Sequence, residues 1–256
     1  MNRRDFLKKA AMGIGTIAAI SLMEHPVVAK ANEVINQQTN SNMKRIMVID
    51  GGPRKNMNTA AMVQAFVEGA QEGGAEVKVV RLYDIDYKGC YSCMACQLKD
   101  KRVPSCRMKD GLTDILAECA EADGLVLASP IYYGEITAMA RAFWERLTFP
   151  WLSYRYGTFA APKKMPVTFI YTMNGMPNNA EDVSKGSMHS VEMMTGMAYG
   201  NPVEVIPACN TTQVRDYSRY EFADGIAEVK KAWRDAHWEE DLQKAREAGK
   251  RMANNQ

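Results

Sequence analysis

The sequence predicts an α/β fold: a doubly wound, five-stranded parallel sheet with helices on both faces, in three α/β/α layers. Short apolar runs alternate with helical patterns along most of the chain, and this alternation is typical of βαβ units, whose strands run parallel. The chain has 256 residues, 46% of them apolar and 24% charged, which excludes collagen-like and disordered classes. Because no internal repeat or second domain is evident, we expect one domain over residues 44–256.

The expected strands are short apolar runs bounded by turn residues. The first and third are almost wholly apolar, as buried strands in a parallel sheet are. The second carries Lys78 and Arg81, which indicates a position at the edge of the sheet. In chain order the five expected strands are residues 45–50, 76–82, 124–129, 166–171 and 203–207.

The expected helices follow from apolar residues spaced three and four apart. The third shows this spacing at Ile136, Met139, Ala140, Phe143, Trp144 and Leu147. Asp110 opens the second, where its carboxylate is a candidate N-cap. The last helix carries Trp233 and Trp238 among charges of both signs, which is typical of a solvated surface. The expected helices are residues 59–71, 110–122, 136–147, 181–196 and 220–252.

Two further apolar features have structural interpretations. Four methionines in and just after the fourth helix lie near helical spacing. We expect them in the core, and contact with a bound ring or with another subunit is the alternative: Met188, Met193, Met194 and Met197. An aromatic segment, Trp151 with residues 154–159, follows the third helix. Exposed segments of this kind often form contacts between subunits, so we expect a homo-oligomer.

The charge balance limits the classes of partner. The formal net charge is +2, without the basic stripe that nucleic-acid binders carry, so we expect no nucleic-acid partner. The longest apolar run, residues 10–23, has 14 residues and is too short to span a bilayer as a helix. We therefore expect no stable membrane anchor.

The first 31 residues have the pattern of an export signal, with Arg3 and Arg4 before the apolar run and an A-x-A site at residues 29–31. The arginine pair resembles twin-arginine signal peptides, a class that exports proteins already folded, often around a cofactor. The resemblance implies cleavage after Ala31, a linker at residues 32–43, and a location in the periplasm or outside the cell. An ordinary secretory signal or an uncleaved anchor is the alternative.

The loop after the first expected strand is a candidate phosphate site, because ligands of such sheets bind at the carboxyl ends of the strands. Its glycines permit close backbone approach, and the helix that follows supplies free N–H groups. The loop matches neither the P-loop nor the dinucleotide fingerprint, and a plain strand-to-helix turn is the alternative. The candidate residues are Gly52, Pro53, Arg54, Asn56, Asn58 and Thr59.

The loops after the third and fourth expected strands are candidates for holding a flat ring. The former is a proline-flanked turn with two tyrosines, for which aromatic core packing is the alternative. The latter is rich in amide groups that can bond the edge of a heterocycle. The candidates are Ser129, Pro130, Ile131, Tyr132, Tyr133 and Gly134 in the former loop, and Thr172, Asn174 and Gly175 in the latter.

Together these loops resemble those of the flavodoxin-like NADPH-dependent FMN reductase and iron–sulfur flavoprotein families, over roughly residues 44–210. The families' first loop, G-S-P-R and then N-T, is matched with Gly52 in place of Ser, and their [ST]-P-[IV]-Y-[YF]-G loop is matched throughout residues 129–134. The resemblance implies a flavodoxin-like fold that binds FMN, with its phosphate in the first loop and its isoalloxazine ring against the other two. We predict no catalytic acid or base, because the flavin carries the chemistry.

Four of the six cysteines lie in the loop 87–107, at Cys90, Cys93, Cys96 and Cys106. The C-x2-C-x2-C spacing is ferredoxin-like, and iron–sulfur flavoproteins carry a compact cysteine motif in this same loop, which favours a [4Fe–4S] cluster. The gap before Cys106 is longer than the family's. The alternatives are three cysteine ligands with one partner elsewhere, disulfides, free thiols and structural zinc. Cys119 and Cys209 are expected to be buried and without a ligand role.

The sequence thus predicts an exported FMN-dependent oxidoreductase that transfers electrons between a redox partner and a small acceptor such as a quinone or a flavin. The cluster would exchange single electrons, and the flavin would convert between one- and two-electron steps. Because NADPH is absent outside the cytoplasm, a redox-protein donor is expected in its place. The alternatives are an electron carrier without a small substrate, as flavodoxin is, and a flavin-free protein with bridged cysteines.

Overall fold

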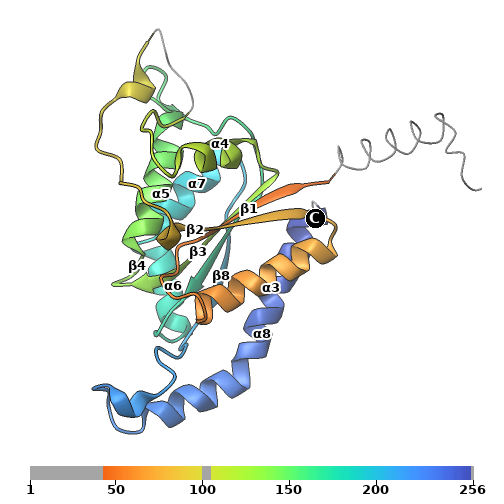
Figure 1. Cartoon of the computed structure of the whole chain (residues 1–256), viewed down its shortest axis with the longest axis vertical. Helices are drawn as coiled ribbons and strands as arrows, with labels where there is room; N and C mark the ends of the chain where they lie inside the picture. The colour runs from red at the N-terminus through yellow and green to blue at the C-terminus, as the bar shows by residue number, and fades with distance from the viewer. Residues whose placement is uncertain (1–42, 100–104, 255–256) are drawn as a thin grey trace, which may run out of the picture. The chain divides into compact units, whose positions relative to one another are not determined.

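Five parallel strands form the central sheet of this computed structural model, which describes residues 43–99 and 105–254 (Figure 1). The strands are β1 (Arg45–Asp50), β2 (Glu76–Arg81), β3 (Gly124–Tyr132), β7 (Val167–Thr172) and β8 (Glu204–Ala208). Their order is β2-β1-β3-β7-β8, and every neighbouring pair is parallel. This topology confirms the predicted flavodoxin-like α/β fold, with β2 at an edge. The expected signal peptide lies outside the described residues.

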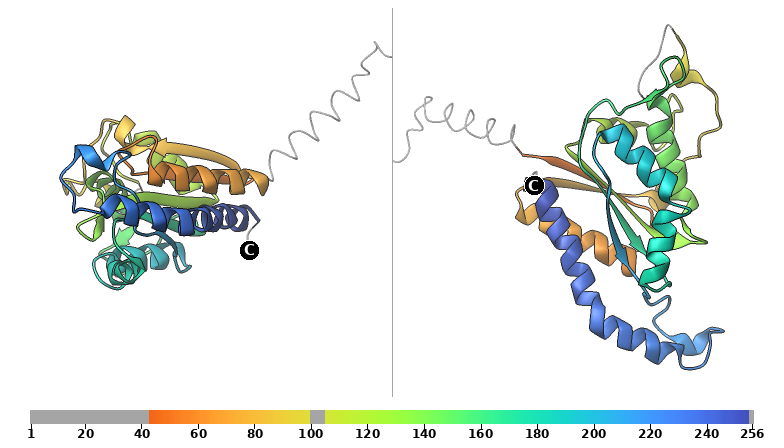
Figure 2. Two further views of the ribbon diagram at one scale, coloured as in Figure 1. Left: turned by 90° about the horizontal axis from the view of Figure 1, so that it is seen from below. Right: turned by 180° about the vertical axis from the view of Figure 1, so that it is seen from behind.

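One face of the sheet is covered by α3 (Asn58–Glu72) and α8 (Ile226–Asn254), which lie side by side (Figures 1 and 2). Glycines permit the close approach of these two helices. A side chain at Gly69 would overlap the backbone of Arg246, and one at Gly249 would overlap the backbone of Phe66. The second half of α8 is therefore fixed against α3, beneath β1, β3, β7 and β8.

The other face is covered by α4 (Thr113–Glu121), α5 (Ala138–Thr148), α6 (Pro177–Lys185) and α7 (His189–Tyr199). Their apolar residues form a second core with the sheet. The short elements are β4 (Glu135–Ile136), which pairs with the end of β3, and the hairpin of β5 (Leu152–Ser153) and β6 (Thr158–Phe159). Four 3-10 turns complete the described chain: η1 (Leu82–Asp84), η2 (Ala95–Gln97), η3 (Phe149–Trp151) and η4 (Tyr217–Arg219).

Three helix predictions need correction. The helix expected over residues 181–196 is two helices, because α6 ends at Lys185 and is followed by Gly186, where a Cβ would lie 2.6 Å from the Asp182 carbonyl oxygen. The last helix begins at Ile226 rather than at residue 220, following Gly225, whose φ of 75° is costly for other residues. Ile136 lies in β4, opposite Ile131, and not in α5.

The predicted helix cap at Asp110 is also wrong. The α4 helix begins at Thr113, and its N-cap, Leu112, makes no side-chain cap. The Asp110 carboxylate accepts from the Leu112 N–H at 3.0 Å and from Arg146 Nη1 at 2.5 Å. Asp110 therefore links the loop before α4 to α5.

The two apolar features divide between core and surface. Met188 is fully buried as expected, but Met193 and Met197 are exposed, because they lie on the outer face of α7. Trp151 is buried against Tyr199, whereas Tyr154 and Tyr156 are exposed. No helix in residues 43–99 and 105–254 is long and apolar enough to cross a membrane.

Candidate functional site

A cavity of about 270 Å³ lies at the carboxyl ends of the strands and is lined by the loops after β1, β3, β7 and β8; we call it the loop cavity. Ten of the predicted residues line it: Gly52, Pro53, Arg54, Asn58, Thr59, Pro130, Ile131, Tyr132, Thr172 and Asn174. Five residues that sequence reasoning missed also line it: Met57, Met173, Thr211, Thr212 and Gln213. The fold thus brings the three predicted loops to one cavity and adds a fourth.

The loop after β1 is held in shape by Asp50. This buried carboxylate accepts from the Gly52 N–H at 2.8 Å and from Arg81 Nη1 at 2.5 Å. Burial raises the pKa of Asp50, although the Gly52 amide and Arg81 both favour its charged form. A Cβ at Gly52 would lie 2.9 Å from Asp50 Oδ1 and 3.1 Å from Thr59 Cβ. Glycine at this position, where the related families carry Ser, therefore matches the tight Asp50 turn.

The start of α3 offers donors for an anion. Its N-cap, Met57, makes no side-chain cap, and the first turn contains no acidic residue, so free N–H groups and the positive end of the helix dipole face the loop. Thr59 Oγ1 lies 2.7 Å from Thr172 Oγ1, which joins the loops after β1 and β7. These features fit a phosphate group.

The loop after β8 closes over these donors. Arg54 Nη1 donates to the Gln213 carbonyl, and Asn58 Nδ2 donates to the Thr212 carbonyl at 2.7 Å. Arg54 and Asn58, the two side chains best suited to hold a phosphate, thus lie on one side of the loop cavity, where they donate to backbone carbonyl oxygens.

The loop after β3 forms a tight hairpin into β4. Tyr133 and Gly134 have φ of 53° and 86°, which suits a two-residue turn of the hairpin type. Tyr132 lines the loop cavity and is 46% exposed, while Tyr133 is fully exposed. An exposed aromatic at the rim of a cavity can pack against a flat ring.

Five predicted residues lie beside the loop cavity rather than in its lining. Ser129 is buried, and its hydroxyl donates to the Pro130 carbonyl at 2.8 Å. The carbonyl of Gly134 accepts from Ser187, and that of Gly175 accepts from the Asn210 N–H at 2.7 Å. The residues outside the lining are Asn56, Ser129, Tyr133, Gly134 and Gly175.

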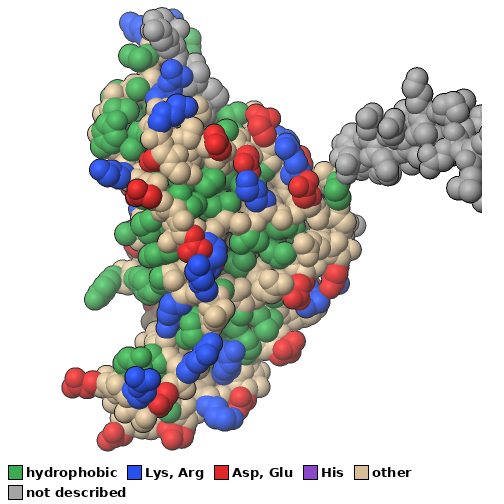
Figure 3. Space-filling model, viewed as in Figure 1, with side chains coloured by type: hydrophobic (Ala, Val, Ile, Leu, Met, Phe, Trp, Pro, Cys, Tyr) green, Lys and Arg blue, Asp and Glu red, His purple; other side chains and the backbone are tan. Residues whose placement is uncertain are grey.

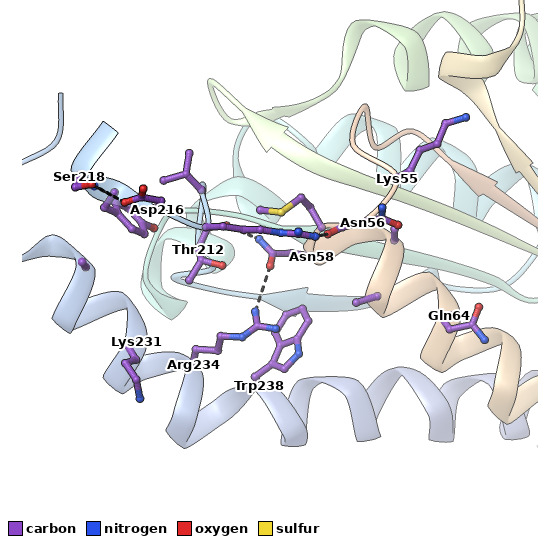
Figure 4. A pocket seen from close by; sticks show the side chains of 17 residues that line it. Lys55, Asn56, Asn58, Gln64, Thr212, Asp216, Ser218, Lys231, Arg234 and Trp238 are labelled. Atoms are coloured by element: carbon purple, nitrogen blue, oxygen red, sulfur yellow. Dashed lines mark hydrogen bonds between the residues drawn. The ribbon is translucent and has the colours of Figure 1, made fainter. Parts of the chain in front are cut away.

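Asn56 instead lines a wider groove of about 1100 Å³ between the start of α3, residues 212–218 and the first half of α8 (Figure 4). Four cations line this basic groove: Lys55, Arg215, Lys231 and Arg234. Lys and Arg side chains also gather around the start of α3 on the surface in Figure 3. Arg234 lies over the Trp238 ring at 4.3 Å, and its Nη1 donates to Asn58 Oδ1 at 3.4 Å. The first half of α8 thus contacts the start of α3, next to the loop after β1.

The four loop cysteines line one small pocket, together with Met94, Arg107, Met108, Arg146, Phe149 and Pro150; we call it the cysteine pocket. Ser92 and Met94 have φ of 58° and 57°, so the chain curls between Cys90 and Cys96. Cys93 is exposed, Cys96 is buried, and both Cys90 and Cys106 are partly buried free thiols. Burial and the three neighbouring thiols raise the pKa of Cys96.

Arg146 gives the cysteine pocket a buried positive charge. Its side chain is fully buried, and Nη1 donates to Asp110 Oδ2 at 2.5 Å and to the Lys88 carbonyl at 3.0 Å. Burial opposes its charge, but Asp110 and the nearby Cys106 outweigh this and raise the pKa of Arg146. The Nε and Nη2 groups are buried without a hydrogen-bond partner among the described residues. Orphaned donors beside four thiols fit an anionic thiolate-bound group.

The four thiols of the cysteine pocket are candidate ligands for a metal centre. Within residues 43–99 and 105–254, no three His, Cys, Asp or Glu side chains converge closely enough to hold one metal ion. Structural zinc requires four ligands around one point, whereas an iron–sulfur cluster takes each thiolate on a different iron. Four thiols around a common pocket supply the thiolate donors that a [4Fe–4S] cluster takes.

A family model and several known sequences are similar to part of this chain. The family model described as NADPH-dependent FMN reductase matches residues 44–199. An iron–sulfur flavoprotein of Methanosarcina thermophila is 28% identical over 153 residues, 60% of this chain and 75% of that protein. One of Methanocaldococcus jannaschii is 30% identical over 102 residues, 40% of this chain and 51% of that protein. The chain spans about half the length of several relatives that it matches.

Solved structures are similar in fold. An NAD(P)H:quinone oxidoreductase from Methanothermobacter marburgensis superposes with a TM-score of 0.56 at 17% identity, over 82% of this chain and 96% of that one. An FMN-dependent NADH-azoreductase from Bacillus anthracis, in complex with FMN, has a TM-score of 0.56 at 15% identity, over 82% of this chain and all of that one. The loop after β8 and α8 lie beyond the residues that the family model matches.

Proposed function

The chain belongs to the NADPH-dependent FMN reductase family, and from this premise we propose that it is an FMN-dependent oxidoreductase with a [4Fe–4S] cluster in the cysteine pocket. FMN would lie in the loop cavity and supply the electron transfer chemistry. One observation carries the proposal: four loops meet at one cavity, with the start of α3, Arg54 and Asn58 directed to it. These donors suit the phosphate, and Tyr132 and Asn174 suit the ring.

The cluster is the finer part of the proposal. Cys90, Cys93, Cys96 and Cys106 would hold the irons, and Arg146 would donate to the thiolate sulfurs. Similarity to iron–sulfur flavoproteins of archaea supports this assignment. We propose that electrons pass between a redox-protein donor, the cluster, the flavin and a small acceptor such as a quinone or another flavin.

Export remains part of the proposal and rests on the first 31 residues alone. A twin-arginine route would carry the folded, cofactor-loaded chain to the periplasm or beyond. NADPH is absent there, and for that reason we propose a redox protein as the donor.

The direct test is to purify the chain anaerobically and measure its absorption spectrum, FMN, iron and sulfide. We expect bound FMN and about four irons per chain. Flavin without iron would remove the cluster from the proposal, and a chain with neither cofactor would refute the proposal altogether. Steady-state turnover with quinones and an artificial donor then separates an enzyme from an electron carrier, which would be reduced without turnover.

The phosphate assignment is tested by replacing Arg54 and Asn58 with Ala together. Hydrogen bonds to charged groups contribute about 1.5–3 kcal/mol each, so we expect the affinity for FMN to fall about 100-fold or more. Lys55→Ala is the matched control, because Lys55 lies in the same loop, pairs with Asp84 at 2.9 Å and does not line the loop cavity. Full FMN occupancy in the double variant would contradict the assignment.

A further inference from the structure

Lys230 is a buried cation with no carboxylate partner. It lies in the first half of α8, is 1% exposed, and forms no ion pair with any described residue. The other strongly buried charges are compensated, since Asp50 pairs with Arg81 and Arg146 with Asp110. A buried charge without an opposite charge costs several kcal/mol, and burial accordingly lowers the pKa of Lys230; an anion bound nearby would favour its charged form.

The ammonium group is bonded only to amide oxygens. Lys230 Nζ donates to the carbonyl of Asn174 at 3.1 Å, to Asn174 Oδ1 at 2.5 Å and to Asn210 Oδ1 at 2.5 Å. These three bonds use its three protons. Lys230 thereby joins the loop after β7 to the loop after β8, both of which line the loop cavity.

These bonds fix the orientation of the Asn174 side chain. Its Oδ1 accepts from Lys230 and also from Gln213 Nε2. With the oxygen occupied by two donors, the Nδ2 group is left to donate into the loop cavity, which Asn174 lines. A positive charge bonded to Oδ1 polarises the amide and makes Nδ2 a stronger donor.

We propose that Lys230 is a positioning residue for the flavin: it orients Asn174 toward the ring and places a positive charge behind it, so that the cavity binds reduced FMN more tightly than oxidised FMN. This inference rests on the proposed function. Reduction of the ring by two electrons with uptake of one proton adds one negative charge to it, and this charge is the anion that the buried ammonium lacks. Charge near the ring is a means by which a protein tunes a flavin. Lys230 lies outside the residues that the family model matches.

The test compares variants of the FMN-loaded full chain. Lys230→Gln retains an amide donor for the same oxygens and removes the charge, and Lys230→Met also removes the donor. The matched control is Lys231→Met, because Lys231 is exposed, points away from Asn58 in Figure 4 and pairs with Asp235 at 2.5 Å. The midpoint potential of the bound flavin is measured by reductive titration with dithionite, and the affinity for oxidised FMN and riboflavin by fluorescence.

We expect Lys230→Gln to weaken the binding of reduced FMN at least tenfold more than that of oxidised FMN, which corresponds to a potential lower by 29.6 mV for a two-electron couple. Lys231→Met should leave the potential unchanged. Asn174→Ala should lower the potential as well, and its effect should not add to that of Lys230→Gln, because one acts through the other. This third variant keeps the test open if the Lys230 variants do not fold.

Two results would overturn the inference alone. One is an unchanged potential in Lys230→Gln and Asn174→Ala with FMN bound. The other is a loss of affinity for FMN but not for riboflavin, which would assign the charge to the phosphate instead. A wild-type chain that binds no FMN would overturn the proposed function, and this inference with it.

Discussion

Replacement of Arg146 with Met tests how the cysteine loop is anchored. The Arg146 side chain is fully buried, and its Nη1 holds Asp110 Oδ2 at 2.5 Å and the Lys88 carbonyl at 3.0 Å. Lys88 lies just before Cys90, the first cysteine of the loop, and Asp110 lies just after Cys106, the last of the four. The Met variant keeps most of the apolar volume but leaves both acceptors without their donor.

The expected loss of stability is about 3 kcal/mol. Breaking a buried ion pair by removing one partner costs about 3–5 kcal/mol. We expect the lower end, because the Asp110 carboxylate is 20% exposed and retains the Leu112 N–H at 3.0 Å. For a domain of this size the melting temperature should fall by about 6–12 °C.

The pH dependence gives a second signature. Burial opposes the charge of Asp110, but Arg146 and the Leu112 amide hold the pKa of that carboxyl below its usual value. A carboxyl group whose pKa is lowered by folding stabilises the protein at pH values above its unfolded pKa of about 3.9. This stabilisation is lost as the pH falls through the folded-state pKa. Arg146→Met should abolish this contribution, so the gap in stability between variant and wild type should close below about pH 4.

The assay is urea unfolding at one fixed FMN concentration, with Arg141→Met as control. Arg141 lies on the same helix, but its pairs with Glu135 and Glu145 are exposed, and such pairs contribute about 1 kcal/mol or less. The double variant Arg146→Met with Asp110→Asn should lose less than the sum of the two single variants, because it leaves no stranded charge. A loss below about 1 kcal/mol in Arg146→Met, or strict additivity, would refute the reasoning.

Two further predictions concern the thiols and the helix crossing. Burial raises the pKa of Cys119 to about 12 and that of Cys209 to about 11, so iodoacetamide at pH 8 should label the exposed Cys93 in the cofactor-free chain and spare these two. Because the pKa of Cys119 is higher in the folded than in the unfolded chain, the protonated thiol stabilises the fold fully below the unfolded value of about 8.5. This stabilisation is lost as the pH rises toward 12. The loss in free energy of unfolding should reach about 1.5–2 kcal/mol at pH 10, and Cys119→Ala should not show it. Gly249→Ala should destabilise the chain by more than about 2 kcal/mol in thermal unfolding, since its Cβ would overlap the Phe66 backbone, whereas Gly157→Ala, where a Cβ meets nothing within 4 Å, should cost only about 1 kcal/mol for its positive φ.

Local patterns carried the prediction of the fold and of three site loops. Strands such as β1 and β3 are apolar runs with turn residues at each end, and parallel strands bring their carboxyl ends together wherever the chain between them is helical. The first loop was predicted despite its departure from the family at Gly52. The structure explains that departure, because the turn around Asp50 leaves little room for a side chain there.

The contributions of the fourth loop and of α8 could not be predicted from sequence. Thr212 and Gln213 hold Asn58 and Arg54 through backbone carbonyls, which any residue type would present. Lys230 is one of many charged residues in a helix whose pattern indicates a solvated surface, and its partner Asn174 is 56 residues away. The inward orientation of Lys230 depends on contacts with the loops after β7 and β8, which the local pattern of α8 does not specify.

Arg146 escaped prediction for a related reason. It lies between Phe143 and Leu147 on the buried face of α5, where an arginine ordinarily extends its charge to solvent. Its burial depends on Asp110, 36 residues earlier. The sequence around Asp110 is equally compatible with a helix cap. An ion pair of this kind forms because the fold brings the two residues together, and neither residue indicates the pair from its local sequence.

The α5 helix lies between the two candidate sites and contacts a residue group of each. At its start, Thr137 Oγ1 donates to the Gly51 carbonyl at 2.9 Å and accepts from the Ala140 N–H at 3.2 Å, so the helix cap is also bonded to the loop after β1. In its last turn, Arg146 lines the cysteine pocket. At 1.5 Å of rise per residue, these two positions are about 14 Å apart along the helix. The α5 helix therefore contacts the loop after β1 at its start and the cysteine pocket at its end.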